Sequence, residues 1–194
     1  MPLLGAQPYV KADVLAGRHG RWMLLVLSLC LSGCPLIISL DYVPSNSAKG
    51  QGALQVGDFI YRPATQGSVR PREVGVPSEG IGRIFLSGEI GAVFTDALKR
   101  ELTHSGYQVN QREGQTQEQA ATPVISGVVE KYALLEPGVF EVAASFTVTK
   151  QDGTRQELAC QARHNEGVIE VMIKTAMRNC IQQFILSAQE AKYF

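Results

Sequence analysis

The chain has 194 residues, of which 45% are hydrophobic and 19% charged, and its formal net charge is zero. This composition is typical of a globular domain, and the length suffices for one domain with a core. A neutral chain lacks the basic field on which nucleic-acid binding depends, so we expect no nucleic-acid partner.

The first feature along the chain is an uncharged apolar run over residues 22–31, preceded by two arginines and a histidine within residues 18–21. A basic flank before a short apolar run is the layout of an export signal. The run ends in Leu-Ser-Gly-Cys at residues 31–34, which resembles the lipobox of bacterial lipoproteins. That resemblance implies cleavage between Gly33 and Cys34, and attachment of a diacylglycerol and an N-acyl chain to Cys34.

The residue after the cysteine is Pro35. In lipoproteins of enteric bacteria an aspartate at this place favours the inner membrane, so its absence implies the periplasmic face of the outer membrane. The acyl chains would hold the protein at the bilayer, because each buried methylene contributes about 0.8 kcal/mol. We expect no other cofactor.

Two alternatives to a lipid anchor remain open at this point. Residues 22–40 carry no charge and could be a transmembrane anchor of minimal length, although Pro35 and the Ser-Gly-Cys interruption weigh against it. A cleaved, secreted form without lipid is the other. Residues 1–17 are long for the basic end of a signal, so translation could also start downstream, for example at Val14.

Three sections follow from this reading: a signal peptide over residues 1–33, a lipidated N-terminus and tether over 34–52, and one periplasmic domain over 53–194. The tether is predicted from its Pro, Ser, Asn and Gly residues, which favour turns and bury little.

The domain shows two kinds of periodicity. Apolar and polar residues alternate over 139–150, which predicts a strand with one buried face. Apolar residues recur every three or four positions over 88–105 and 165–192, which predicts two helices, with Ser87 and Asn165 as candidate N-caps. We expect further strands over residues 53–61, 107–110, 124–135 and 155–164. The predicted fold class is α+β, with a mostly antiparallel sheet of four to five strands and two helices packed on one face.

A Pro- and Gly-rich loop is predicted over residues 62–80, with Arg62, Arg70 and Arg72 in it and Arg83 nearby. A loop of this length is either a mobile, solvated segment or a functional one. In the second case it would contact an anionic partner or a lipid headgroup.

Cys160 and Cys180 are the two cysteines of the domain. The strand pattern directs Cys160 toward the helices, and the helix pattern directs Cys180 toward the sheet, so we predict a disulfide between them in an oxidising periplasm. Two free, buried thiols are the alternative. No metal site is expected, because His104 and His164 have no ligand spacing.

No catalytic motif is present in the sequence. His104 is expected to complement a helix dipole, and His164 to lie at the surface. Asp58 follows Gly57 inside an apolar strand, which suggests a bulge or a turn. Met172 and Met177 are expected in the core. We therefore expect a protein that is not an enzyme.

The order of several weak motifs over residues 53–190 resembles the YajG-type family of small bacterial envelope lipoproteins. The motifs are LQVGDFIYRP, FTDALKRELTHSGYQV, ISGVVEKY, TKQDG and AMRNCIQQFI. The architecture is also similar to auxiliary lipoproteins of ABC export and to accessory lipoproteins of polymer secretion. These resemblances imply a non-enzymatic accessory or assembly factor that acts with an envelope protein or as a homo-oligomer. A binding module for a small ligand, lipid or glycan is the alternative.

Overall fold

The computed structural model describes residues 35–45, 48–76, 82–110, 122–136 and 138–194. The predicted cleavage and lipidation residues, Gly33 and Cys34, lie outside this part of the chain, as does the rest of the predicted signal peptide. The fold below is that of the second of two compact units, Pro35–Phe194.

The unit is α+β, as predicted, and its larger sheet has five strands in the order β5-β2-β6-β7-β8. Three of these strands, β6 (Val124–Glu136), β7 (Val139–Thr149) and β8 (Arg155–His164), form an antiparallel meander. Strand β2 (Ala53–Tyr61) comes first in the chain among these five strands. It pairs in parallel with β6 on one side and with β5 (Gln108–Asn110) on the other. The sheet is therefore mixed, with its antiparallel pairs in the meander.

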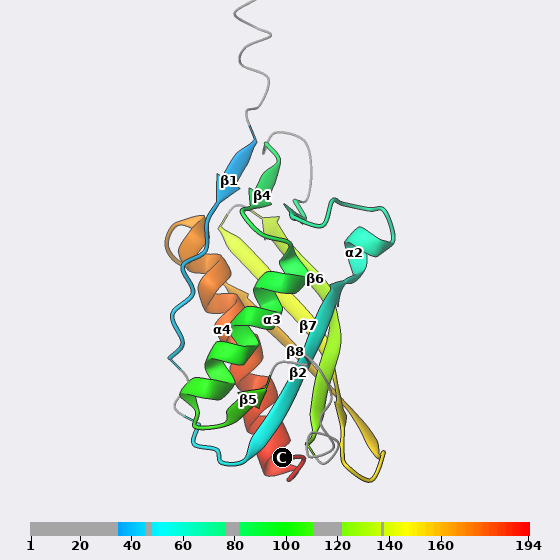
Figure 1. Cartoon of the computed structure of the whole chain (residues 1–194). Coiled ribbons are helices and arrows are strands. Elements are labelled where there is room, and N and C mark those ends of the chain that lie inside the picture. Colours follow the sequence, from blue (N-terminus) through cyan, green and yellow to red (C-terminus); the bar gives the residue numbers. More distant parts are fainter. Residues whose placement is uncertain (1–34, 46–47, 77–81, 111–121, 137) are drawn as a thin grey trace, which may run out of the picture. The chain divides into compact units, whose positions relative to one another are not determined.

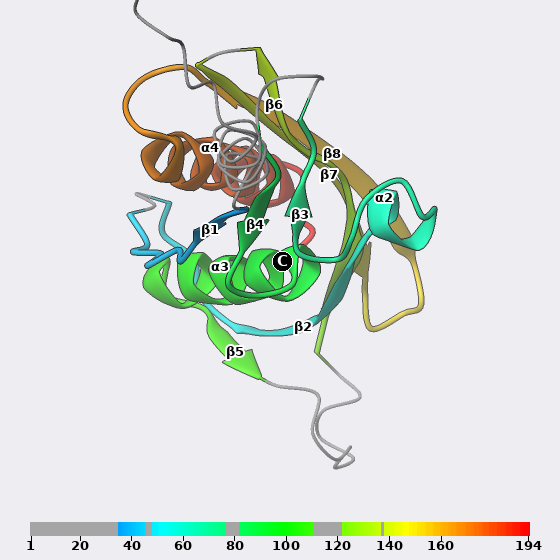
Figure 2. The ribbon, with the colours of Figure 1, turned by 90° about the horizontal axis from the view of Figure 1, so that it is seen from above.

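Two long helices cover one face of this sheet, as predicted (Figures 1 and 2). Helix α3 spans Ile90–His104 and packs on β2, and helix α4 spans Ile169–Glu190 and packs on β7 and β8. The layer between helices and sheet is filled by aromatic rings, of which Phe146 and Phe184 stack with their centroids 3.9 Å apart. Phe59 and Phe94 extend this cluster and are buried.

Both helices begin later than the sequence predicted. The N-caps are Glu89 and Val168 rather than Ser87 and Asn165, and neither cap makes a side-chain hydrogen bond. Gly167 precedes α4 with φ of 87°, a conformation that suits glycine and sets the helix start. The helix ends, His104 and Glu190, lie within two residues of the predicted ones, and Gly106 follows α3 with φ of 100°, which suits a helix C-terminus.

The predicted loop over residues 62–80 is confirmed only in part, since residues 66–72 lie outside any helix or strand but the segments beside them do not. It begins with a short helix, α2 (Arg62–Thr65), whose second residue is a proline, and it continues into strand β3 (Glu73–Val74). A further strand that the sequence did not predict, β4 (Ile84–Leu86), lies between β3 and β1 (Leu36–Ile38) in a second sheet of three strands. These short strands contribute to the core, because Val74, Ile84 and Leu86 are at most 3% exposed.

The interruption at Gly57 and Asp58 is a bulge, one of the two alternatives predicted for it. The register between β2 and β6 shifts between Val56 and Phe59, and Asp58 turns to solvent. The bulge keeps Val56 and Phe59 on the core side of the strand, where both are buried.

Candidate functional site

The N-terminal residues 35–45 and 48–52, which we call the strap, pack against the domain instead of forming the predicted free tether. Strand β1 pairs in parallel with β4, and the Leu36 N–H donates to the Arg83 carbonyl at 3.0 Å. Ile38 is 7% exposed and joins the core. The turn-forming residues of the strap misled the prediction, because the apolar residues between them find partners far away in the sequence.

The middle of the strap is fixed by a buried carboxylate of α3. Tyr42 donates a 2.6 Å hydrogen bond to Oε1 of Glu101, and the Ser45 N–H approaches the same oxygen at 3.3 Å. Arg178 of α4 completes the group, with its Nε 3.9 Å from that oxygen and its guanidinium donating to the Val43 carbonyl at 2.8 Å. Glu101 is 1% exposed, so the strap covers a charge that is paired from two directions.

The far end of the strap is held by close packing. The Gly50 N–H donates to the Ser105 carbonyl at 2.7 Å, and Gln189 of α4 donates to the Lys49 carbonyl at 3.1 Å. The ring of Tyr107 lies where a side chain on Gly50 would be, so glycine is required there. The strap is therefore attached to β4 at Leu36–Ile38, and to the two helices and the residue after α3 at Tyr42–Ser45 and Lys49–Gly50.

Where the strap begins, the surface combines exposed apolar side chains with arginines. We define the β1–β4 end as Leu36, Ile37, Arg70, Arg72, Arg83 and Phe85. The side chains of Leu36 and Ile37, which are adjacent in β1, are 50% and 63% exposed. Figure 1 shows β1 and β4 together at this end, away from the C-terminus.

The three arginines of the β1–β4 end differ in what they contact. Arg72 donates through Nε to the Leu86 carbonyl at 3.1 Å and through its terminal nitrogen to the Ser87 carbonyl, so it braces β4. Arg83 pairs with Glu73 at 3.5 Å but is 63% exposed. The guanidinium of Arg70 has no hydrogen-bond or ion-pair partner among the described residues.

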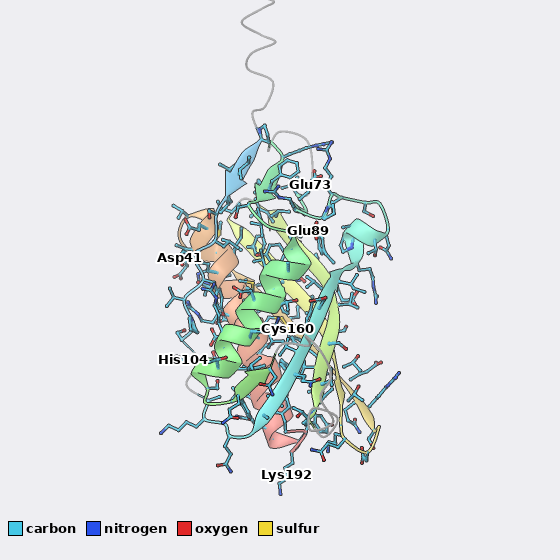
Figure 3. The ribbon with its side chains drawn as sticks, viewed as in Figure 1. Asp41, Glu73, Glu89, His104, Cys160 and Lys192 are labelled. Carbon is cyan, nitrogen blue, oxygen red and sulfur yellow. A yellow bond between two sulfur atoms is a disulfide. The ribbon has the colours of Figure 1, made fainter. Side chains whose placement is uncertain are left out.

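A surface hollow of about 410 Å³ lies within this end. It is lined by Ile37, Arg70, Pro71, Arg72, Phe85 and Glu89. Figure 3 shows Glu89 and Glu73 at this end of the molecule and Lys192 at the opposite end. Two of the three arginines predicted for a contact surface therefore lie together, in a setting that offers apolar contact and positive charge at once.

Arg62, the third of the predicted arginines, does not join them. It lies in α2 and forms a 2.8 Å ion pair with Glu130 of β6. Its charge is therefore directed to the sheet, away from the hollow that Arg70 and Arg72 line.

The sheet face opposite the helices carries a second polar group, centred on Glu141. Lys131 and Arg163 each place a nitrogen 3.2 Å from Oε2, and Gln161 donates to Oε1. Burial alone would raise the pKa of Glu141, but the hydrogen bonds from Gln161 and Lys131 and the charges of Lys131 and Arg163 hold that pKa below its usual range. The carboxylate is 2% exposed and fully paired, as expected for a structural cluster.

Cys160 and Cys180 form the predicted disulfide, with their Cα atoms 5.1 Å apart. It joins the edge strand β8 to the middle of α4 inside the core, where Cys180 is fully buried. The cross-link therefore fixes α4, and with it Arg178, against the sheet.

The remaining residues singled out in the sequence fall at scattered places. His104 is exposed at the end of α3, near a shallow hollow that Asp96 and Lys99 also line, and His164 ends β8. Within the described ranges no three His, Cys, Asp or Glu side chains are placed to hold a metal. Met172 and Met177 lie in the core, as predicted.

Glu101 and Tyr42 were missed by the sequence analysis. A signal was available for Glu101, which follows Ala97 and Leu98 by four and three residues and precedes Leu102, so it falls inside the apolar stripe of α3. A carboxylate in such a stripe requires a buried partner.

Comparisons with known proteins give the fold alone. No protein-family model matches the sequence, and no curated protein does. A DUF330 protein from Xanthomonas campestris matches at a TM-score of 0.58 with 9% identity over 81% of this chain and 99% of the other. An uncharacterised protein matches at 0.53 with 10% identity over 81% and 99%. Rare lipoprotein B from Shewanella oneidensis matches at a TM-score of 0.37 with 11% identity over 74% of this chain and 96% of the other. The chain thus shares the fold of the first two structures.

Proposed function

We propose that this protein is a non-enzymatic accessory or assembly lipoprotein of the cell envelope, cleaved between Gly33 and Cys34 and anchored by acyl chains on Cys34. It resides on the periplasmic face of the outer membrane. The observation that carries the proposal is the strap, because the chain passes from the lipobox-like sequence directly into a folded strand at Leu36.

The strap also bears on the transmembrane alternative. That alternative needs the uncharged run over residues 22–40 as a continuous helix, but residues 36–38 are a strand paired with β4. The run that remains, residues 22–35, is shorter than the roughly 20 residues that a spanning helix needs. Within the described residues, the structure contains no helix with the length and apolarity to cross a bilayer.

The disulfide supports export to an oxidising compartment. Disulfides persist in the periplasm and outside the cell, whereas the cytosol keeps thiols reduced. The Cys160–Cys180 cross-link lies within the folded domain, so it fits a protein whose domain folds after crossing the inner membrane.

An accessory role is supported by the surface that the fold leaves uncovered. The helices cover one sheet face, and the other face presents polar and charged side chains around Glu141 and Glu130. This outer face is the surface for an envelope protein or a second copy of the chain. A small ligand between helices and sheet gains no support, because the stacked phenylalanines fill that layer.

Replacement of Cys34 tests the proposal directly. In cells fed a labelled fatty acid, we expect the wild-type protein to take up label and to lose residues 1–33, and Cys34→Ala to take up no label and to keep the leader. Cys30→Ala is the matched control, since it removes a cysteine from the same apolar run but outside the lipobox, and it should behave as wild type. Labelling and processing of Cys34→Ala at the wild-type level would refute the proposal.

A further inference from the structure

The attachment of the strap has a consequence for how the domain meets the membrane. A flexible tether over residues 34–52 would let the domain stand away from the bilayer. The structure shows instead that Leu36 is hydrogen-bonded to Arg83 and that β1 is paired along its whole length. Consecutive Cα atoms are about 3.8 Å apart, so an acylated Cys34 would lie within about 8 Å of Leu36.

The β1–β4 end has the chemistry that a bilayer surface recognises. Leu36 and Ile37 expose apolar side chains next to the chain position of the anchor. Two guanidinium groups lie at the same end. That of Arg70 has no partner among the described residues, and that of Arg83 is 63% exposed. Apolar side chains partition into the interfacial region, and arginines beside them bind lipid phosphates.

The described carboxylates of this end are fewer than its described arginines. Glu73 is paired with Arg83 and accepts a hydrogen bond from the Arg70 N–H, and Glu89 lines the hollow. Among the described residues of this end, three arginines thus stand against two glutamates. Removing the exposed apolar surface of Leu36 and Ile37 from water would be favourable by roughly 25 cal/mol per Å².

The opposite end of the domain is different. It carries the turn between β7 and β8, whose residues from Gln151 to Arg155 are polar or glycine and exposed. The C-terminal turns of α4 lie toward the same end (Figure 1). They include Leu186, which is 49% exposed. An orientation that placed this end on the bilayer would bury charge and leave Leu36 and Ile37 in water.

We propose that the β1–β4 end rests on the bilayer, with Leu36 and Ile37 in the interfacial region and Arg70 and Arg83 against lipid phosphates. The acyl chains on Cys34 and this surface then act together as a two-part anchor, which fixes the orientation of the domain. The outer sheet face and α4 stand along the membrane normal, available to a partner in the periplasm. This inference rests on the proposed function.

Tryptophan fluorescence can test this orientation without background. The single tryptophan of the chain is Trp22, which the proposed cleavage removes. We would introduce Leu36→Trp into the full chain, purify the processed protein from membranes and reconstitute it into phosphatidylethanolamine–phosphatidylglycerol vesicles with brominated acyl chains. Leu186→Trp is the matched control, since Leu36 and Leu186 are 50% and 49% exposed.

We expect Leu36→Trp to lose more than half of its emission to the brominated lipid and to shift to shorter wavelength, while Leu186→Trp keeps its emission. Equal quenching at both positions, or none at either, in protein that floats with the vesicles would overturn the proposed orientation and leave the lipid anchor intact. Protein that neither carries lipid nor floats would refute the proposed function, and the orientation with it.

The arginine contact has its own test in the Leu36→Trp protein. Replacing Arg70 and Arg83 together by glutamine should reduce the quenching in vesicles that contain phosphatidylglycerol. Arg155→Gln, an exposed arginine at the opposite end, should leave it unchanged. Quenching that is insensitive to the double substitution would exclude phosphate binding by these arginines.

Discussion

The hydroxyl of Tyr42 and the carboxylate of Glu101 are joined by a 2.6 Å hydrogen bond across 59 positions of sequence. Glu101 is carried into the interior by α3, and Tyr42 reaches it from the strap. Because Arg178 of α4 approaches the same carboxylate, one group links the strap to both helices. This group attaches the middle of the strap, while the pairing of β1 with β4 attaches its beginning.

Tyr42→Phe is therefore expected to weaken the attachment of the strap. Removing the hydroxyl leaves a buried carboxylate short of a donor, which costs about 1–3 kcal/mol of unfolding free energy. Denaturant unfolding measures this loss, and hydrogen exchange at the Ser45 and Gly50 amides should become faster. Tyr193→Phe, which removes a weak 3.5 Å hydrogen bond near the C-terminus, is the control. Unchanged stability and exchange in Tyr42→Phe would show that the group does not hold the strap.

Three buried tyrosines predict a loss of stability at alkaline pH. Burial raises the pKa of Tyr42, Tyr61 and Tyr132 above the ordinary value of 10.0, and the neighbouring Glu101 raises that of Tyr42 further. Above pH 10 the unfolded chain releases protons that the folded chain retains, so their contribution is complete below pH 10 and falls as pH rises. Unfolding free energies measured between pH 8 and pH 11 by urea titration should show this fall.

Tyr132 differs from the other two tyrosines because its hydroxyl is buried and has no hydrogen-bond partner among the described residues. Tyr132→Phe should therefore keep or raise the stability at pH 7, because it removes an unsatisfied polar group, and it should flatten the alkaline fall. A loss of more than about 1 kcal/mol at pH 7 would contradict this account of the site.

Glu141 predicts the opposite pH dependence. Its pKa is lowered in the folded state, so its contribution is present above the unfolded value of 4.5 and is lost as pH falls through the lowered value. Glu141→Gln removes charge-assisted hydrogen bonds to Lys131 and Arg163 and should cost roughly 2 kcal/mol at pH 7. Its unfolding free energy should change less than that of the wild type between pH 6 and pH 3. Parallel acid profiles for the two proteins would exclude this role.

The disulfide is expected to stabilise the domain by about 3 kcal/mol, the value that chain entropy gives for a loop of this size. Urea unfolding of the oxidised protein, compared with protein reduced by a phosphine, measures this difference. The Cys160→Ala, Cys180→Ala double variant should match the reduced protein and not respond to reductant. Equal stability of oxidised and reduced protein would show that the cross-link adds nothing to the fold.

Local patterns predicted most of the fold, and long-range pairing accounts for what they missed. The alternation over β7 and the stripes of α3 and α4 are repeated over several turns or residue pairs, so they define buried faces without knowledge of a partner. The same patterns directed Cys160 and Cys180 into one layer and so predicted the disulfide. In contrast, β1, β3 and β4 have two or three residues each, which is too short for a periodicity.

The candidate site was predicted in part, for the same reason. Arg70 and Arg72 were identified by their charge in a loop, and the structure places them together. Leu36 and Ile37 were assigned to a tether because their neighbours are turn-formers. Their pairing with Ile84 and Phe85, 48 positions later, is a tertiary contact that no local pattern encodes.

The lipid anchor is the central claim, and the intact mass of the protein purified from membranes tests it most directly. The account predicts a chain that begins at Cys34 and carries a diacylglyceryl group and an amide-linked acyl chain. Digestion should place the whole added mass on the N-terminal peptide. A chain that begins upstream of Cys34, or one that begins there with no added mass, would contradict it.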